Sequence, residues 1–327
     1  MKAQWAGAEL LVSKTLWEKH RLTLGGELRE DFQINVANFD ADPFASYVES
    51  CRDEFSFALY AQDEMRLLTN LTFNAGVRYD HFSTFGDTVN PRGAVVWSPW
   101  REGTFKFLYG EAFRAPNAIE LDYIQPTYKA NPNLGPETIR SYEVVLEQGL
   151  AENLRASGSL YFNQIKGLIG QSLDPNDNLN FFGNLQEVEV RGFELELEGR
   201  WKHGLRGRVS YTFAEARDTA TDQVLDNAPR HLGKANLAIP LWREKIFAGI
   251  ELQAMSSRKT VQGNEAGAFW VANLTLFSRE LAKGLDVSAS LYNIFNERYH
   301  DPVSSDFVQD TLQQDGRQFR VQLTYRF

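Results

Sequence analysis

The sequence has little of three things that would place it in common protein classes. Cys51 is its only cysteine among 327 residues, which excludes an intrachain disulfide and a cysteine-ligated metal cluster. Its formal net charge of −9 argues against nucleic acid as a partner, because phosphate binding needs a basic surface. The mean hydropathy is −0.39, and no apolar run comes near the roughly 18 residues expected of a membrane-spanning helix.

The signatures of common catalytic and nucleotide-binding sites are missing too. None of the five histidines stands at a metal-ligand spacing from another, and no serine, histidine and aspartate grouping is visible. There is no Walker A loop and no dinucleotide-binding fingerprint. We therefore expect no enzyme, no cofactor and no metal site.

Alternation of apolar and polar residues is what the sequence has in abundance. The pattern is clearest at the end of the chain, where every second residue is apolar: Phe319, Val321, Leu323, Tyr325 and Phe327. A period of two puts one set of side chains on each face of a β-strand. Further alternating segments lie at 22–28, 71–79, 154–162, 205–213, 246–254, 270–276 and 285–291. We expect about fifteen strands and see no convincing amphipathic helix.

Strands of this kind predict an all-β fold, an antiparallel transmembrane β-barrel. Each strand of such a barrel keeps a polar face toward its bore, so the mean hydropathy stays low. Outer-membrane barrels end on a strand that closes with an aromatic residue, and we interpret Tyr325 and Phe327 as that assembly signal. The expected surroundings are outer-membrane lipid.

The connections between the strands alternate between short and long. The long ones are expected at 33–54, 83–91, 114–138, 165–187, 215–229, 256–267 and 297–316. Short periplasmic turns and long outer loops are typical of outer-membrane barrels. Four tryptophans fall in or beside short turns and predict an aromatic girdle at one membrane interface, unless they flank turns by chance: Trp17, Trp100, Trp201 and Trp242.

One strand changes phase at Arg191 and Gly192. Val188 and Val190 share one parity, whereas the apolar residues after Gly192 have the other. A glycine at the change predicts either a β-bulge or the point where the strand leaves the lipid.

Two motifs go beyond alternation. Residues 109–117 read Tyr-Gly-Glu-Ala-Phe-Arg-Ala-Pro-Asn, and residues 131–138 read Asn-Pro-Asn-Leu-Gly-Pro-Glu-Thr. Together with the segments 192–196, 291–299 and 320–327, they resemble the signature of TonB-dependent outer-membrane receptors along essentially the whole chain. The motif residues are Phe113, Arg114, Pro116, Asn131, Pro132, Leu134, Pro136 and Glu137.

The resemblance implies a barrel of 22 strands around an N-terminal plug, which is more than this chain can hold. We find no plug, no energy-coupling box and no signal peptide at residues 1–8. An odd number of strands would also place the first and last strands parallel if the sheet closed. Residues 1–327 are therefore expected to form the C-terminal portion of a receptor barrel, without the plug and first strands.

The polar residues have two possible roles, and we expect architecture more than ligand contact. Pro116 and Pro132 restrict the backbone at strand ends, and Arg114 could pair with a carboxylate of the bore. Eight charged residues are expected to line the bore, where the resemblance implies contact with a plug: Lys106, Glu143, Glu147, Glu194, Glu196, Glu198, Arg206 and Arg208. The acidic outer loops contain no complete calcium motif and are expected to be solvated.

The function implied by the resemblance is uptake of a scarce nutrient chelate across the Gram-negative outer membrane. The solute, such as a ferric siderophore, haem or cobalamin, would bind at the outer loops, and TonB would act only through the missing plug. A passive outer-membrane pore or structural barrel is the alternative, and a soluble β-rich enzyme or adhesin is a third possibility. The sequence does not identify the solute.

Overall fold

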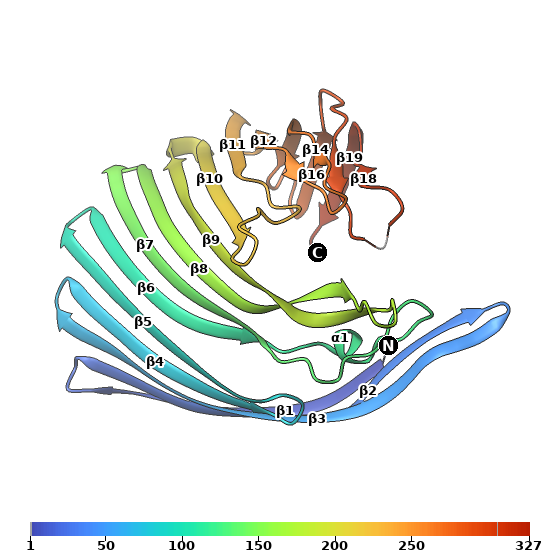
Figure 1. Ribbon diagram of the computed structural model, residues 1–327. Helices are drawn as coiled ribbons and strands as arrows, with labels where there is room; N and C mark the ends of the chain where they lie inside the picture. The colour runs from blue at the N-terminus through green and yellow to red at the C-terminus, as the bar shows by residue number, and fades with distance from the viewer. Residues whose placement is uncertain (1, 306) are drawn as a thin grey trace.

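The structure, a computed structural model, describes residues 2–305 and 307–327 as one large, curved antiparallel sheet (Figure 1). Its fifteen strands follow one another as a meander, each paired with its neighbour along the chain. In sheet order they are β1 Lys2–Leu16, β2 His20–Ala41, β3 Phe44–Leu68, β4 Leu71–Phe82, β5 Gly86–Trp100, β6 Gly103–Arg114, β7 Glu137–Ala151, β8 Leu154–Leu173, β9 Asn180–Arg200, β10 Arg206–Asp218, β11 His231–Trp242, β12 Ile246–Met255, β15 Phe269–Ser278, β16 Leu285–Tyr292 and β19 Gln318–Tyr325. The predicted number of strands is confirmed.

The remaining elements are short and lie in the connections. They are α1 Ala118–Asp122, η1 Lys202–Gly204, the pair β13 Arg258–Lys259 and β14 Glu265–Ala266, and the pair β17 His300–Pro302 and β18 Thr311–Gln313. The sequence did not reveal α1, because five residues are too few to show a helical period. Within residues 2–305 and 307–327, no helix has the length and apolar character needed to cross a membrane.

The strand register places the apolar rows of neighbouring strands on the same face of the sheet. Directly opposed residues form a continuous row across five strands, namely Val95, Phe107, Val144, Leu160 and Phe193. Leu160 is 63% exposed and Leu195 is 53% exposed, so nothing that the structure describes covers this face. A sheet with one uncovered apolar face is what a lipid-facing barrel wall requires.

The opposite face is polar and lines the inside of the curve. Lys106 and Arg155 both contact the carboxylate of Glu147 on this face, and the segment that carries α1 lies within the curve (Figure 1). All eight charged residues predicted for the bore share this parity in the strand register.

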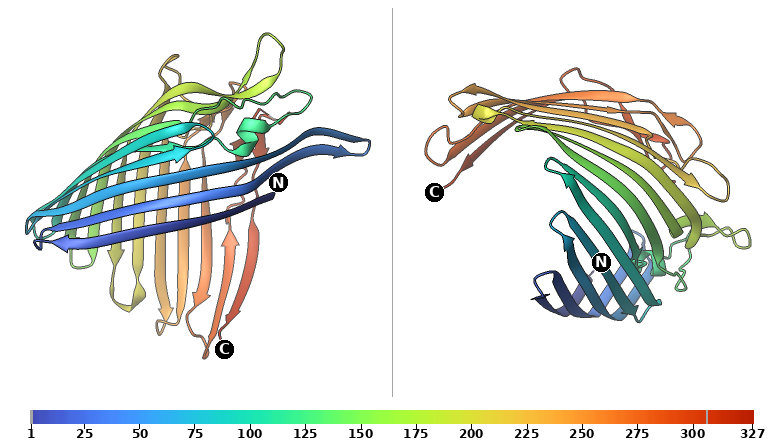
Figure 2. Two further views of the ribbon diagram at one scale, coloured as in Figure 1. Left: turned by 90° about the horizontal axis from the view of Figure 1, so that it is seen from below. Right: turned by 90° about the vertical axis from the view of Figure 1, so that its left-hand side faces the viewer.

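The sheet remains open. Its order begins at β1 and ends at β19, and the two strands do not pair in the part of the chain that the structure describes (Figure 2). As the first and fifteenth strands of an antiparallel meander, they run in the same direction. Each therefore presents one edge of unpaired backbone groups.

Three of the predicted long loops are in fact largely strand. β2 and β3 continue through most of 33–54, β5 begins at Gly86, and β8 and β9 cover most of 165–187. The apolar row ends there, yet the backbone groups still pair along both strands. Loss of alternation therefore marks the end of the apolar row and not the end of the strand.

The predicted β-bulge at Gly192 is wrong. The ladder between β9 and β10 runs without a shift through this residue, and the irregularity lies on β8 between Ile165 and Leu168. Glycine is needed at 192 for close approach, because a Cβ there would lie 2.3 Å from the carbonyl oxygen of Phe213. Val188, beyond it, is 1% exposed. This inward turn of apolar residues is the pattern expected where a strand leaves the lipid.

Candidate functional site: the outer loops and the polar wall

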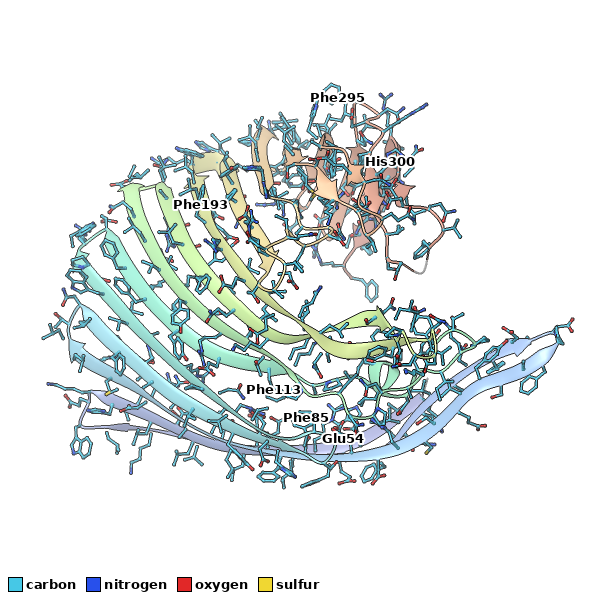
Figure 3. The ribbon with its side chains drawn as sticks, in the orientation of Figure 1. Glu54, Phe85, Phe113, Phe193, Phe295 and His300 are labelled. Carbon is cyan, nitrogen blue, oxygen red and sulfur yellow. The ribbon has the colours of Figure 1, made fainter. Side chains whose placement is uncertain are left out.

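All the long connections lie at one edge of the sheet, which also holds the short turns at 42–43 and 83–85, and every connection at the other edge is short. This follows from the antiparallel meander, since alternate connections must share an edge. The long edge carries α1 and the small strand pairs, and the segment 115–136 folds over it (Figure 2). Side chains project from both faces of the sheet, and those of the polar inner face, which we call the polar wall, point toward the space inside the curve (Figure 3).

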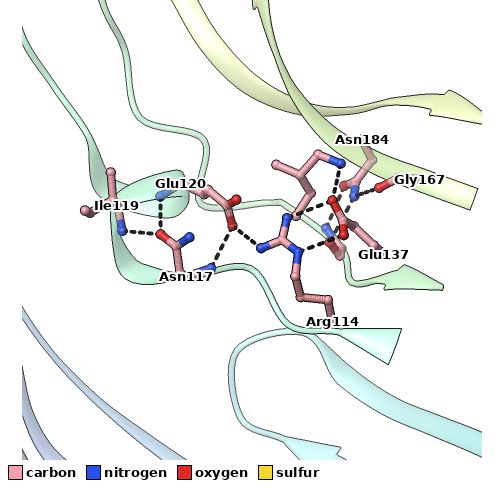
Figure 4. A network of polar contacts seen from close by, with 9 residues as sticks. Arg114, Asn117, Ile119, Glu120, Glu137, Gly167 and Asn184 are labelled. Carbon is pink, nitrogen blue, oxygen red and sulfur yellow. Dashed lines mark hydrogen bonds and ion pairs between the residues drawn. The ribbon is translucent and has the colours of Figure 1, made fainter. Parts of the chain in front are cut away.

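Arg114 is the centre of a polar network that joins four elements (Figure 4). Its Nε and Nη2 donate to the two carboxylate oxygens of Glu137, each at 2.7 Å, and its Nη1 donates to Glu120 at 2.9 Å. Glu137 also accepts from the backbone N–H of Ile169 at 2.7 Å. The side chains thereby tie the end of β6 to α1, β7 and β8. A bidentate pair of this kind also fixes geometry.

The helix α1 begins with a capping box directly after Pro116. The Asn117 side chain accepts from the backbone N–H groups of Ile119 at 2.9 Å and Glu120 at 3.0 Å. The Glu120 carboxylate accepts from the backbone N–H of Asn117 at 2.8 Å and binds Arg114 as well. One acidic residue thus serves both the helix cap and the arginine network.

The second motif packs against β9. Asn131 donates to the carbonyl of Phe182 at 2.8 Å, and Leu134 is only 3% exposed. Asn184 accepts from the N–H of Gly135 at 2.9 Å and donates to its carbonyl at 3.0 Å. The same amide donates to the carbonyl of Gly167 at 2.8 Å (Figure 4). Sequence reasoning missed Asn184, since its partners lie 17 and 49 residues away.

Lys129 links the connection 115–136 to the turn at 174–179. Its ammonium group donates to Asp174 and, at 2.8 Å, to Asp177, and it lies 5.6 Å from the ring centroid of Phe181. The hydrogen bond from Lys129 lowers the pKa of both carboxyl groups, and the bond to Asp174 raises the pKa of Lys129. We call these three charged residues the loop latch.

A second group of charges lies on the polar wall beside α1. Arg78 donates to Glu27 at 2.9 Å and to Asp80 at 2.8 Å, while Arg29 donates to the largely buried Asp31 at 2.8 Å. These residues, together with Asn117 and Ala118, border a cavity of about 380 Å³. The guanidinium groups of Arg29 and Arg78 already have carboxylate partners, so the cavity offers polar contacts without a surplus of positive charge.

A third polar region lies nearer the tight turns. It is a cavity of about 490 Å³ bordered by Glu147, Arg155, Glu198 and Arg200. Arg208 donates to Glu196 at 2.5 Å nearby. Ion pairs orient these side chains on the wall, between neighbouring strands for Glu147 with Arg155 and Glu196 with Arg208, and along β9 for Glu198 with Arg200.

Asp218, an acidic residue in the connection predicted at 215–229, is engaged by its own turn. Its carboxylate accepts from the N–H and hydroxyl of Thr221 at 2.8 and 2.9 Å and from the N–H of Ala220 at 3.0 Å. The hydrogen bonds leave Asp218 serving the loop backbone, while Asp222 lies beside Arg217.

The four tryptophans of the predicted girdle all lie at the edge of the tight turns. Trp17 is in the turn after β1, Trp100 ends β5, Trp201 precedes η1 and Trp242 ends β11. Glycines make room for two of these rings, because a Cβ on Gly103 or Gly199 would lie 2.1 Å from Trp100 or Trp201.

The two C-terminal aromatic residues are placed differently. Tyr325 pairs with Leu285 as the last residue of β19, and Phe327 lies beyond the strand, fully exposed.

A family model describes the same fold. The model of the TonB dependent receptor-like β-barrel matches residues 4–294. Among curated proteins, the vitamin B12 transporter BtuB of Photobacterium profundum is 24% identical over 98% of this chain and 51% of its own length. The heme/hemopexin utilization protein C of Haemophilus influenzae is 24% identical over 79% of this chain and 41% of its own length.

Solved structures give the same picture of the fold. A mutant of the ferric enterobactin receptor PfeA of Pseudomonas aeruginosa superposes with a TM-score of 0.81 at 21% identity, over 99% of this chain and 54% of that one. The copper transporter OprC has a TM-score of 0.79 at 16% identity, over 99% of this chain and 57% of that one. The chain spans about half the length of the curated relatives it matches.

Proposed function

Because this chain belongs to the family of TonB-dependent receptors, we propose that the full-length protein takes up a scarce nutrient chelate across the outer membrane. The homologues are Gram-negative outer-membrane receptors and transporters, not enzymes, and the outer membrane is the location of this chain too. The relatives carry different solutes by name, among them vitamin B12 and heme. A ferric siderophore, haem, cobalamin or a similar chelate is therefore the proposed cargo.

The observation that carries the proposal is a polar wall beneath a set of mutually braced outer connections. Arg114, Lys129 and Asn184 each join segments that are far apart in the sequence. Such bracing holds a set of outer loops in position to bind a small solute. In this proposal the solute binds at these loops, and TonB acts through a plug that is not part of residues 1–327.

The open edges of the sheet favour a barrel that contains more strands than these fifteen. β1 and β19 run in the same direction, so joining them directly would pair them in parallel. An unpaired backbone edge in lipid costs several kcal/mol for each unsatisfied group. We propose that residues 1–327 are the C-terminal part of the receptor barrel, and that further strands and a plug complete it. Bacterial barrels with even strand numbers avoid the parallel closure.

The residues singled out from the sequence have proposed roles in architecture rather than in ligand contact. Phe113, Arg114 and Pro116 would set the end of β6, and the motif at 131–137 would seat the following loop against β9. The four girdle tryptophans would lie at the periplasmic interface with lipid. Tyr325 and Phe327 would act as the signal for barrel assembly.

Uptake by a bacterial strain tests the proposal. The full-length gene would be expressed in cells that lack their own receptors, with and without a working TonB system. Accumulation of labelled ferric siderophores, haem and cobalamin would be measured. We expect one chelate class to accumulate above its outside concentration only when TonB is active. Entry that ignores TonB and stops at the outside concentration would contradict the proposal and identify a passive pore.

A further inference from the structure

The hairpin of β2 and β3 extends well beyond the rest of the sheet (Figure 1). β4 ends at Phe82, which pairs with Ser56 of β3. From Phe44 to Glu54, the edge of β3 that faces away from β2 has no strand neighbour in the part of the chain that the structure describes. A free strand edge of this length is a template for an additional strand.

This ribbon is held firmly at its base. Val36 and Val48, on opposite strands, are each 6% exposed and pack with Ala118 of α1. Asp122 of α1 accepts from the hydroxyl of Ser50 at 2.9 Å and from Arg52 at 3.0 Å. The projecting part is therefore pre-ordered, which lowers the entropy lost when a partner binds to it.

The tip of the ribbon carries exposed aromatic rings. Phe39 is 56% exposed and Phe44 is 73% exposed, and their ring centroids are 5.9 Å apart. The opposed register places both on the face away from Val36 and Val48. Tyr47, also near the end of the hairpin, donates to Asp40. We call Phe39, Phe44 and Tyr47 the aromatic tip.

The charge around the aromatic tip has a single sign. From residue 32 to residue 51, the only charged side chains are Asp40, Asp42 and Glu49. The next cationic residue along the chain, Arg52, is bound to Asp122. An anionic lipid surface would repel this tip, whereas lysine and arginine side chains would be attracted both to the carboxylates and to the faces of the rings.

We propose that this hairpin docks an extended, basic segment of another protein, which adds as a strand along the free edge of β3. Backbone pairing supplies affinity in this mode, and alternate side chains supply specificity. Lysine or arginine residues of the segment lie over Phe39 and Phe44 and beside Asp40 and Asp42. The surface goes beyond the proposed uptake function, because it lies on the projecting ribbon and needs no particular solute.

Peptide binding to the full-length receptor in nanodiscs tests the proposal. The probe is a peptide of alternating lysine and valine, and its affinity is measured with and without added salt. We expect saturable binding that weakens as salt rises. The double variant F39S/F44S and the double variant D40N/D42N should each weaken it about tenfold, the size expected for losing a cation–π or charge contact at a partly exposed site.

Matched variants and peptides decide between this proposal and the alternatives. Phe32→Ser removes an exposed ring of β2 outside the tip, and Asp222→Asn removes an exposed carboxylate of another loop; both should leave the affinity unchanged. A peptide of alternating glutamate and valine should not bind. Equal binding of both peptides, or losses in the control variants as large as those in the tip variants, would overturn the proposal. So would binding of the tip to anionic lipid vesicles in place of the basic peptide.

Discussion

Arg114 shows how much of the outer architecture depends on one side chain. Glu120 and Glu137 are each 13% exposed at their side chains and share this arginine as a partner. A carboxylate that loses a charged partner while partly buried is costly, because its desolvation is no longer offset. Arg114 therefore stabilises the connection 115–136 more than the exposure of its own side chain suggests.

Replacement of Arg114 by glutamine should loosen the connection 115–136. We expect a loss of about 2 kcal/mol in local stability, the size of one hydrogen bond between charged groups. Hydrogen exchange of residues 117–134 in the full-length receptor measures it. Arg101→Gln is the matched control, since Arg101 is 94% exposed and lies at the tight-turn edge. Unchanged exchange in R114Q would show that the network does not hold the loop.

The loop latch should open in acid. The pKa values of Asp174 and Asp177 lie below their ordinary value of 3.8. The contribution of these carboxylates to the stability of the loop latch is therefore complete above pH 3.8 and is lost as the pH falls further. The pKa of Lys129 lies above its ordinary value of 10.5, so its contribution is complete below that value and is lost only at higher pH. Between these limits the latch stays closed.

Hydrogen exchange of residues 174–179 across this pH range measures the latch. We expect constant protection through the neutral range, after correction for the intrinsic exchange rate, and rising exposure below pH 3.8. Lys129→Met should weaken this pH dependence, and the remainder comes from the backbone N–H groups of Asn176 and Leu179, which also donate to these carboxylates. Protection that fell steadily through the neutral range would point to another titrating group.

At the scale of the strand, Gly192 of β9 is a position where neighbouring atoms leave no room for a side chain. A Cβ at this position would meet the Phe213 carbonyl at 2.3 Å and the Tyr161 hydroxyl at 2.5 Å. The backbone of β10 therefore approaches β9 more closely here than a side chain would permit, and the Tyr161 ring of β8 occupies the space beside it. To admit a side chain, β10 would have to shift and the Tyr161 ring would have to move.

Replacement of Gly192 by alanine should destabilise the barrel by about 1–3 kcal/mol, as overpacking does elsewhere. Urea unfolding of the full-length receptor in lipid vesicles measures this change. Gly233→Ala is the matched control on β11, because a Cβ there would meet nothing within 4 Å. A G192A protein as stable as the control would mean that the strands are not held as closely as the structure has them.

The strands could be predicted from the sequence where lipid constrains them, and less well beyond it. Alternation located β8, β10, β12 and β19, because each needs an apolar row on one side. It failed for the outer half of β2 and β3, where no lipid demands such a row. The contacts of Asn184 could not be predicted either, since they depend on which segments, distant in the sequence, the strand register brings together.

At the scale of the whole molecule, the central feature is that the sheet has one apolar face and one polar face. Leu160 lies in the middle of the apolar row between Val144 and Phe193, and the neighbouring Ser159 faces the other way. Leu160→Arg should cost about 2–4 kcal/mol if this row lies near the middle of the bilayer. Ser159→Arg on the polar face should cost much less. The urea midpoints of the two variants in lipid vesicles make the comparison, and equal losses would argue against a lipid-facing row.

Cysteine scanning along β8 tests the central claim most directly. In a Cys51→Ser background of the full-length receptor, single cysteines at positions 156–163 would carry a nitroxide label in a reconstituted bilayer. The account predicts a period of two: labels at 156, 158, 160 and 162 collide with lipid-soluble oxygen, and those at 157, 159, 161 and 163 with a water-soluble nickel complex. Equal exposure of both sets, or shielding of the even positions from lipid, would contradict it.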